Sequence, residues 1–195
     1  MSGQFDGRPV VPGSGGLRPL GLAAVEITGG FWAERQEVNS TATIAHCHDW
    51  MERMGWVGNF RAAVEGRLPQ DRKGVVFTDS DVYKLMEAAA WEAGRSGSAD
   101  ADGRFTTLAE VIAPVQADDG YLNTVFGRAG QPPRYSDLGW GHELYCYGHM
   151  LRWPGPGPER RKPLRRCGET SGRPRLRDVR CRSTRSSRVA RSSRR

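Results

Sequence analysis

The sequence predicts an all-α fold for most of its length, followed by a basic segment that does not fold. Two observations carry this prediction. Apolar residues recur at helical spacing in four separate stretches, and residues 151–195 hold 16 Lys and Arg against 3 Asp and Glu. The first 150 residues have a formal net charge of −6, although the whole chain has +7. The part that can fold is therefore acidic, and the basic character belongs to the tail.

The stretch before residue 40 is expected to contain little regular structure. Residues 1–23 are rich in Gly and Pro and lack the apolar run of a secretion signal, so we expect a flexible lead. Residues 25–27 alternate apolar and charged side chains, which favours a short strand. Phe31 and Trp32, which follow two glycines, open a helical stretch.

Two helices with clear apolar stripes come next. The first is predicted over residues 41–54, with Gly55 ending it. The second is predicted over residues 79–93, where Asp79 or Ser80 can cap the N-terminus. The stripe residues in the two helices are Ile44, Cys47, Trp50, Met51 and Met54, and Val82, Leu85, Met86, Ala89 and Ala90. Each set forms an apolar stripe along one face of its helix.

Two further helices complete the predicted fold. Residues 94–104 are rich in Gly, Ser and Asp and predict an exposed loop. A helix is expected over residues 106–116, with Pro114 kinking its last turn. After a turn at 118–120, a final helix is predicted over residues 138–151.

The Arg-rich tail, residues 152–195, allows two interpretations. Its few apolar residues follow neither helical nor strand spacing, so we expect it to be disordered. One interpretation is an out-of-frame translation, because the preceding helical pattern stops in mid-turn at Trp153-Pro154. The other is a basic arm that neutralises nucleic-acid phosphates, although no aromatic residue follows Trp153 to stack on bases. We favour the frameshift and do not expect nucleic acid as a partner.

Histidine and cysteine residues raise the question of a metal site. His142, Cys146 and His149 lie at i, i+4 and i+7, on one face of a helix, which is a conceivable zinc face. The other interpretation is that they line a pocket or satisfy hydrogen bonds between helices. His46 and His48 lie on opposite sides of their helix and cannot grip one ion together.

Two other groups of residues have both a chemical and a structural interpretation. Asp79 and Asp81, with Lys84 and Glu87 nearby, offer carboxylates for acid–base work or simply begin a helix with an ion pair. The segment 120–124 places Tyr121 beside an amide, which suits either sugar recognition or a turn.

Three motifs in register give the chain a family resemblance. They are TDSDVYKLMEA at 78–88, DGYLNT at 119–124 and HELYCYGHM at 142–150, with support from NFRAA at 59–63 and GFW at 30–32. Their order and spacing resemble the β-L-arabinofuranosidase-type glycoside hydrolases, family 127. The resemblance covers about residues 25–151.

The resemblance implies a catalytic (α/α)₆ toroid, of which this chain supplies about five of twelve helices over residues 24–151. It implies removal of terminal β-L-arabinofuranose from glycans with retention of configuration, through a cysteine nucleophile near a zinc ion and a glutamate acid/base. It places His142 against the sugar and carries Tyr121 and Asp79 over as further substrate contacts. The partner is then an arabinofuranosyl carbohydrate.

The chain departs from the family where the chemistry lies. The nucleophile, the acid/base and the zinc ligands of the family come later, and nothing in residues 152–195, including Cys167 and Cys181, matches them. We therefore expect an N-terminal fragment that is inactive alone, with zinc bound only in the full-length enzyme. A small zinc-binding helical module and a nucleic-acid-binding protein are the alternatives. The four cysteines lack zinc-ribbon or C-x-x-C spacing, and no run of 18 apolar residues occurs, so we expect a reducing, cytoplasmic setting without a membrane span.

Overall fold

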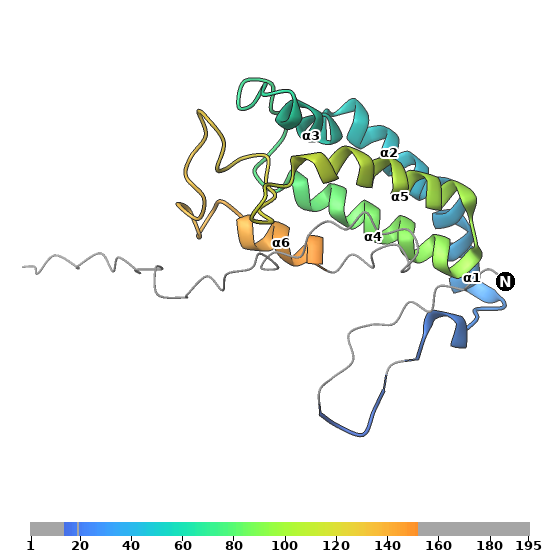
Figure 1. Cartoon of the computed structure of the whole chain (residues 1–195). Helices are drawn as coiled ribbons and strands as arrows, with labels where there is room; N and C mark the ends of the chain where they lie inside the picture. Colours follow the sequence, from blue (N-terminus) through green and yellow to red (C-terminus); the bar gives the residue numbers. More distant parts are fainter. Residues whose placement is uncertain (1–13, 19, 152–195) are drawn as a thin grey trace, which may run out of the picture.

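The computed structural model describes residues 14–18 and 20–151 and is helical (Figure 1). The described residues contain no β-strand, and their α-helices are α1 Gly30–Val38, α2 Ile44–Arg53, α3 Trp56–Val64, α4 Thr78–Ser96, α5 Ala99–Ile112 and α6 Glu143–Leu151. Short turns of other helical types are η1 Leu22–Ala24, η2 Asn39–Thr43 and η3 Ala113–Val115. The all-α prediction is confirmed. The expectations for residues 1–13 and for the basic tail lie outside the described residues.

Helix α4 is the element around which the others pack. It contacts α2, α3 and α5, and α6 packs against it as well (Figure 1). The predicted stripe explains this position, because Val82, Leu85, Met86 and Ala89 are all at most 5% exposed. The predicted cap is wrong: α4 begins at Thr78 after Phe77, and no side chain caps its N-terminus. Asp79 instead bonds to a distant loop, described below.

Helix α3 is a helix that the apolar spacing did not predict. Gly55, with φ 76°, ends α2 as expected, but α3 begins at the very next residue. The left-handed backbone at Gly55 turns the chain sharply, and a glycine adopts it without strain. Val57 and Phe60 are fully buried beneath the neighbouring helices. With nine residues, α3 is shorter than the window of about 11–18 residues over which helical spacing is recognised.

Helices α4 and α5 form a tight antiparallel hairpin. The predicted loop over residues 94–104 is wrong, since only Gly97 and Ser98 separate the two helices. Gly97 ends α4 in the left-handed conformation (φ 70°), and the Ser98 hydroxyl accepts a hydrogen bond from the backbone N–H of Ala101 at 3.2 Å. The polar residues that suggested a loop therefore belong to the end of α4 and the start of α5. Pro114 lies in η3, where the α-helical ladder of α5 has already ended.

Two other elements differ from the sequence expectation. Residues 25–27 have no regular secondary structure, so the predicted short strand is wrong. The last helix begins at Glu143 rather than at residue 138. The preceding residues form a loop because His142 has a φ of 56°, which interrupts a right-handed helix at that point.

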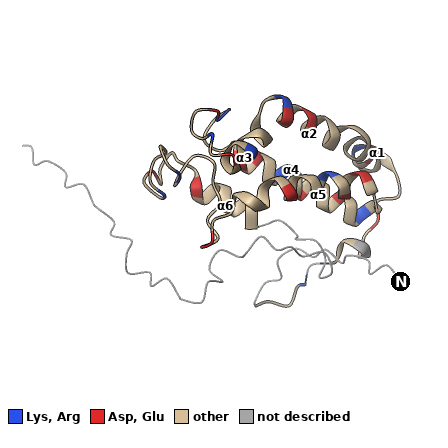
Figure 2. Cartoon of the chain, turned by 45° about the horizontal axis from the view of Figure 1, so that its top comes forward, with Lys and Arg blue, Asp and Glu red and all other residues tan. Residues whose placement is uncertain are grey.

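Charged residues of opposite sign lie side by side over the helices (Figure 2). Arg61 contacts Glu52 at 2.6 Å across two helices, and Arg104 contacts Asp100 at 2.9 Å within α5. Exposed pairs of this kind contribute little stability each, about 0 to 1 kcal/mol. None of the helices in the described part of the chain combines the length and apolar composition needed to cross a lipid bilayer.

Candidate functional site

Three residues predicted to touch a ligand gather at one end of α4. Asp79 lies in the first turn of α4, Tyr121 in the loop after η3, and His142 immediately before α6. Hydrogen bonds from Thr124 to Asp79 and from Tyr121 to Glu143 tie the loop to both helices. The His142 ring lies 5.2 Å from the ring of Phe77, the residue that precedes α4, so His142 reaches the same end of the fold.

Asp79 anchors the loop to α4. Its side chain is 1% exposed and accepts two hydrogen bonds from Thr124, one from the backbone N–H at 2.8 Å and one from the hydroxyl at 2.6 Å. The guanidinium of Arg72 donates to the same hydroxyl oxygen at 3.3 Å. Burial raises the pKa of Asp79, and the Thr124 bonds and the charge of Arg72 act against that rise. Both carboxylate oxygens are thus engaged within the protein.

Tyr121 is fixed on three sides. Its hydroxyl donates to a carboxylate oxygen of Glu143, and its backbone N–H donates to Asp119 at 3.1 Å. The guanidinium carbon of Arg134 lies 3.9 Å from the centre of the Tyr121 ring, as a cation–π contact. Burial and the neighbouring Glu143 raise the pKa of the phenol, which stays protonated as a donor. The ring is 5% exposed.

Glu143 is a functional candidate that the sequence analysis missed. Its side chain is 2% exposed, although it lies in the first turn of α6. One carboxylate oxygen accepts from the Tyr121 hydroxyl, and the other accepts from the backbone N–H of Tyr135 at 2.7 Å. Its position directly after His142 within a matched motif was the available signal.

One ring nitrogen of His142 is held by the backbone. Its Nδ1 lies 2.5 Å from the carbonyl oxygen of Trp140. A carbonyl oxygen only accepts, so Nδ1 carries the proton in this contact. The imidazole is partly exposed, lies edge-on to the ring of Tyr145 and is tilted against the ring of Phe77.

The proposed zinc face is not assembled as a ligand set. Cys146 is 1% exposed, and burial, together with the charge of Asp79, raises the pKa of its thiol to about 12. A thiol of that kind resists the deprotonation that metal binding requires. Across the described ranges, no group of three or more His, Cys, Asp or Glu side chains is placed to hold a metal. In the described part of the chain, His142, Cys146 and His149 therefore do not form the ligand set of a zinc-binding module, and the zinc ligands that the family resemblance implies are expected later in the family's sequence.

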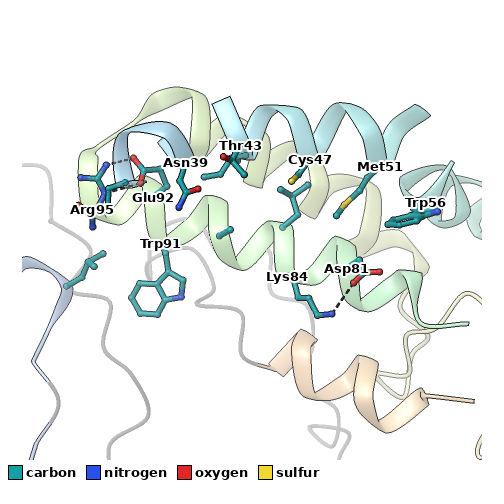
Figure 3. Close-up of a pocket in the computed structure, with 15 residues that line it drawn as sticks. Asn39, Thr43, Cys47, Met51, Trp56, Asp81, Lys84, Trp91, Glu92 and Arg95 are labelled. Carbon is teal, nitrogen blue, oxygen red and sulfur yellow. Dashed lines mark hydrogen bonds and ion pairs between the residues drawn. The ribbon is translucent and has the colours of Figure 1, made fainter. Parts of the chain in front are cut away.

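A groove of about 820 Å³ runs between α1–α2 and α4 (Figure 3). Its walls are mostly apolar and are formed by Leu22, Gln36, Asn39, Thr43, Ile44, Cys47, Met51, Trp56, Asp81, Lys84, Leu85, Ala88, Trp91, Glu92 and Arg95. Toward α6 the lining becomes polar, where Lys84 contacts Asp81 at 3.0 Å. Lys84 also donates to the Tyr145 hydroxyl at 2.9 Å. Tyr145 packs edge-on against His142, and neither of these two rings is among the residues that line the groove.

Comparison with known proteins matches residues 24–152 to the family model described as "Beta-L-arabinofuranosidase, GH127 catalytic domain". A curated relative is the non-reducing end β-L-arabinofuranosidase of Bifidobacterium longum subsp. longum. It is 34% identical over 99 residues, which are 49% of this chain and 15% of the relative.

Two solved structures share the fold. One is a GH127 β-arabinofuranosidase with a TM-score of 0.60 and 26% identity, matched over 67% of this chain and 22% of that one. The other is the GH127 β-L-arabinofuranosidase of Geobacillus stearothermophilus T6, with a TM-score of 0.58 and 27% identity over 67% of this chain and 23% of that one. The predicted fold class, part of an (α/α)₆ toroid, is confirmed. The chain thus spans less than a quarter of the length of each of these three relatives.

Proposed function

Because this chain belongs to the β-L-arabinofuranosidase family defined by the GH127 catalytic domain, we propose that residues 24–151 form the substrate-holding N-terminal part of a glycoside hydrolase. The substrate class is a glycan with terminal β-L-arabinofuranosyl residues, the sugar named for the relatives. The observation that carries this proposal is His142, a partly exposed imidazole that the Trp140 carbonyl holds 5.2 Å from the aromatic ring of Phe77. An imidazole nitrogen and an aromatic face are groups that recognise the hydroxyls and the apolar face of a sugar.

In this proposal, the three predicted contact residues have different roles. His142 binds the sugar directly. Tyr121 and Asp79 act behind it, because their polar atoms are already bonded to Glu143 and Thr124. That Tyr121 or Asp79 touches the sugar itself stays a prediction.

The chemical step is proposed to require groups beyond the described residues. A cysteine nucleophile needs a thiolate at working pH, and Cys146 is buried with a raised pKa, so it does not suit that role. We therefore propose that the 195-residue chain binds an arabinofuranoside weakly but does not hydrolyse it. The free thiols of Cys47 and Cys146 support our proposal of a reducing, cytoplasmic setting. The nucleic-acid alternative rests on residues 152–195, outside the described part, and stays a prediction.

The test is a pair of assays on the full chain. Titration with methyl β-L-arabinofuranoside, followed by NMR, should shift the His142 ring resonances, and His142→Ala should abolish saturable binding. His46→Ala, on the exposed face of α2, is the matched control and should bind like the unaltered chain. Absence of saturable binding to the unaltered chain would refute the binding role. Release of arabinose from p-nitrophenyl β-L-arabinofuranoside would refute the claim that the chain alone is inactive.

A further inference from the structure

We propose that Glu143 is a positioning residue that fixes the His142 imidazole. The role of the fixed imidazole in holding sugar rests on the proposed function, but the positioning itself does not. Glu143 never faces the ligand in this proposal. It acts through the backbone on either side of His142.

The carboxylate of Glu143 is buried and fully hydrogen-bonded. Glu143 is 2% exposed, and each of its two oxygens accepts one hydrogen bond. A buried carboxylate is retained only when such bonds replace those it made with water. One donor is the Tyr121 hydroxyl and the other is the backbone N–H of Tyr135. Glu143 therefore joins three separate segments of the chain.

The backbone of residues 135–142 adopts an unusual conformation at both ends. Tyr135 has φ 59° and His142 has φ 56°, so a left-handed non-glycine residue lies at each end of this loop. Such residues are uncommon and persist where surrounding contacts over-determine them. The Glu143 carboxylate accepts a hydrogen bond from the backbone N–H of Tyr135, and Glu143 directly follows His142 in the chain. Glu143 therefore connects the two ends of the loop.

Hydrogen bonds inside that loop hold His142 at a fixed orientation. The side chain of Asp137 accepts from the N–H of Trp140 at 2.9 Å, and its carbonyl accepts from the N–H of Gly141 at 3.0 Å. A side chain at Gly141 would meet the carbonyl oxygen of Asp137 and the ring of Phe126. The Trp140 carbonyl, in turn, holds Nδ1 of His142. The hydrogen bond between Tyr135 and Glu143 therefore fixes the His142 imidazole indirectly, through the backbone of residues 135–142.

The substitution Glu143→Gln separates this role from simple space filling. Glutamine has nearly the same shape, but its amide NH₂ faces one of the two donors, so one hydrogen bond is lost. We expect the NMR cross-peak between the rings of His142 and Phe77 to weaken at least severalfold. The cross-peak between the core rings of Phe60 and Tyr83, whose centroids are 5.9 Å apart, should stay unchanged. Glu110→Gln, at an exposed position on α5, should alter neither signal.

Tyr121→Phe is the second variant, because it removes a single donor and leaves the Glu143 charge in place. It should weaken the His142–Phe77 cross-peak to a smaller extent. An unchanged His142–Phe77 cross-peak in Glu143→Gln would overturn the proposal. If Glu143→Gln also loses the Phe60–Tyr83 signal while Tyr121→Phe keeps both signals, Glu143 is only a core residue, and the proposal is equally overturned.

The sugar titration distinguishes failure of this inference from failure of the proposed function. Glu143→Gln should bind methyl β-L-arabinofuranoside about tenfold more weakly than the unaltered chain, as expected for one charged hydrogen bond. Equal binding by both proteins would overturn the positioning role. No binding by either, together with a displaced His142 ring in the variant, would leave the positioning intact and refute the proposed ligand.

Discussion

Asp79 and Thr124, which are 45 residues apart in the chain, are joined by two hydrogen bonds to a single carboxylate. The bonds run from the N–H and the hydroxyl of Thr124 at 2.8 and 2.6 Å, to different oxygens of Asp79. A carboxylate placed this way does more than begin a helix, because it holds the loop that carries Tyr121. The structure therefore links the first turn of α4 to the residues around His142.

The pH dependence of stability should reveal the burial of Asp79. Its pKa is raised in the folded protein, so its contribution to stability is complete below the unfolded value of 3.8 and declines as pH rises through the folded value. Asp79→Asn removes that decline and leaves one donor of Thr124 unsatisfied, at a cost of about 1–3 kcal/mol in the free energy of unfolding.

Urea unfolding of Asp79→Asn and of the unaltered chain between pH 3 and pH 8 measures this contribution to the free energy of unfolding. The difference in unfolding free energy from the unaltered chain should be largest at low pH and shrink as pH rises. Asp118→Asn, at an exposed turn position, serves as the control and should follow the unaltered chain. A difference that grows with pH would contradict the assignment.

His48 should weaken the fold in acid. Burial, followed by the charge of Arg104, lowers its pKa, and Glu52 and Asp49 only partly oppose this. Its contribution to stability is therefore present above the unfolded value of 6.5 and is lost as pH falls through the folded value. In His48→Gln, thermal unfolding followed by circular dichroism should show a smaller drop in Tm between pH 7 and pH 5. The same drop in His48→Gln and in the exposed-site variant His46→Gln would argue against this role.

The two described cysteines should differ in reactivity. Cys146 is buried and its thiol pKa is raised to about 12, whereas Cys47 lies partly exposed on the groove. Because the thiolate is the reactive form, iodoacetamide at pH 8 should modify Cys47 first. Peptide mapping by mass spectrometry should find Cys146 modified only after unfolding in urea. Equal modification of both thiols in the folded chain would show that α6 does not protect Cys146.

Two glycines in the α4–α5 hairpin should respond to alanine in opposite directions. Gly97 has a φ of 70°, so Gly97→Ala should lower the free energy of unfolding by about 1 kcal/mol through backbone strain alone. Gly103 is helical with open space around it, so Gly103→Ala should raise that energy by about 0.5–1 kcal/mol. Urea titration of both variants checks the pair. Destabilisation by both would mean that α5 is not helical at residue 103.

The sequence predicts those parts of the fold that depend on local spacing. Val82, Leu85 and Met86 are buried as their stripe requires, and Gly55 ends α2. Prediction fails where a residue type that is common in loops is also favoured at a helix end. Ser98 belongs to a polar stretch that favours a loop, yet it caps a helix.

The candidate site is harder to predict than the helices. His142 and Tyr121 follow from matched motifs, but the partner of Glu143 lies 22 residues away in the chain. A hydrogen bond between residues so far apart in the chain depends on the tertiary arrangement of the loop, which local spacing does not reveal. The left-handed φ of His142 and of Tyr135 leaves no compositional signal, because neither residue is a glycine.

The two-residue connection between α4 and α5 has a consequence for the order in which the molecule assembles. Contacts within this hairpin join neighbouring stretches of chain, so they close quickly and at small entropic cost. The Asp79–Thr124 and Tyr121–Glu143 bonds must wait until the ribosome has released the later segments. During synthesis, the helical hairpin precedes the His142 end of the molecule, and that end is the last described part to become ordered.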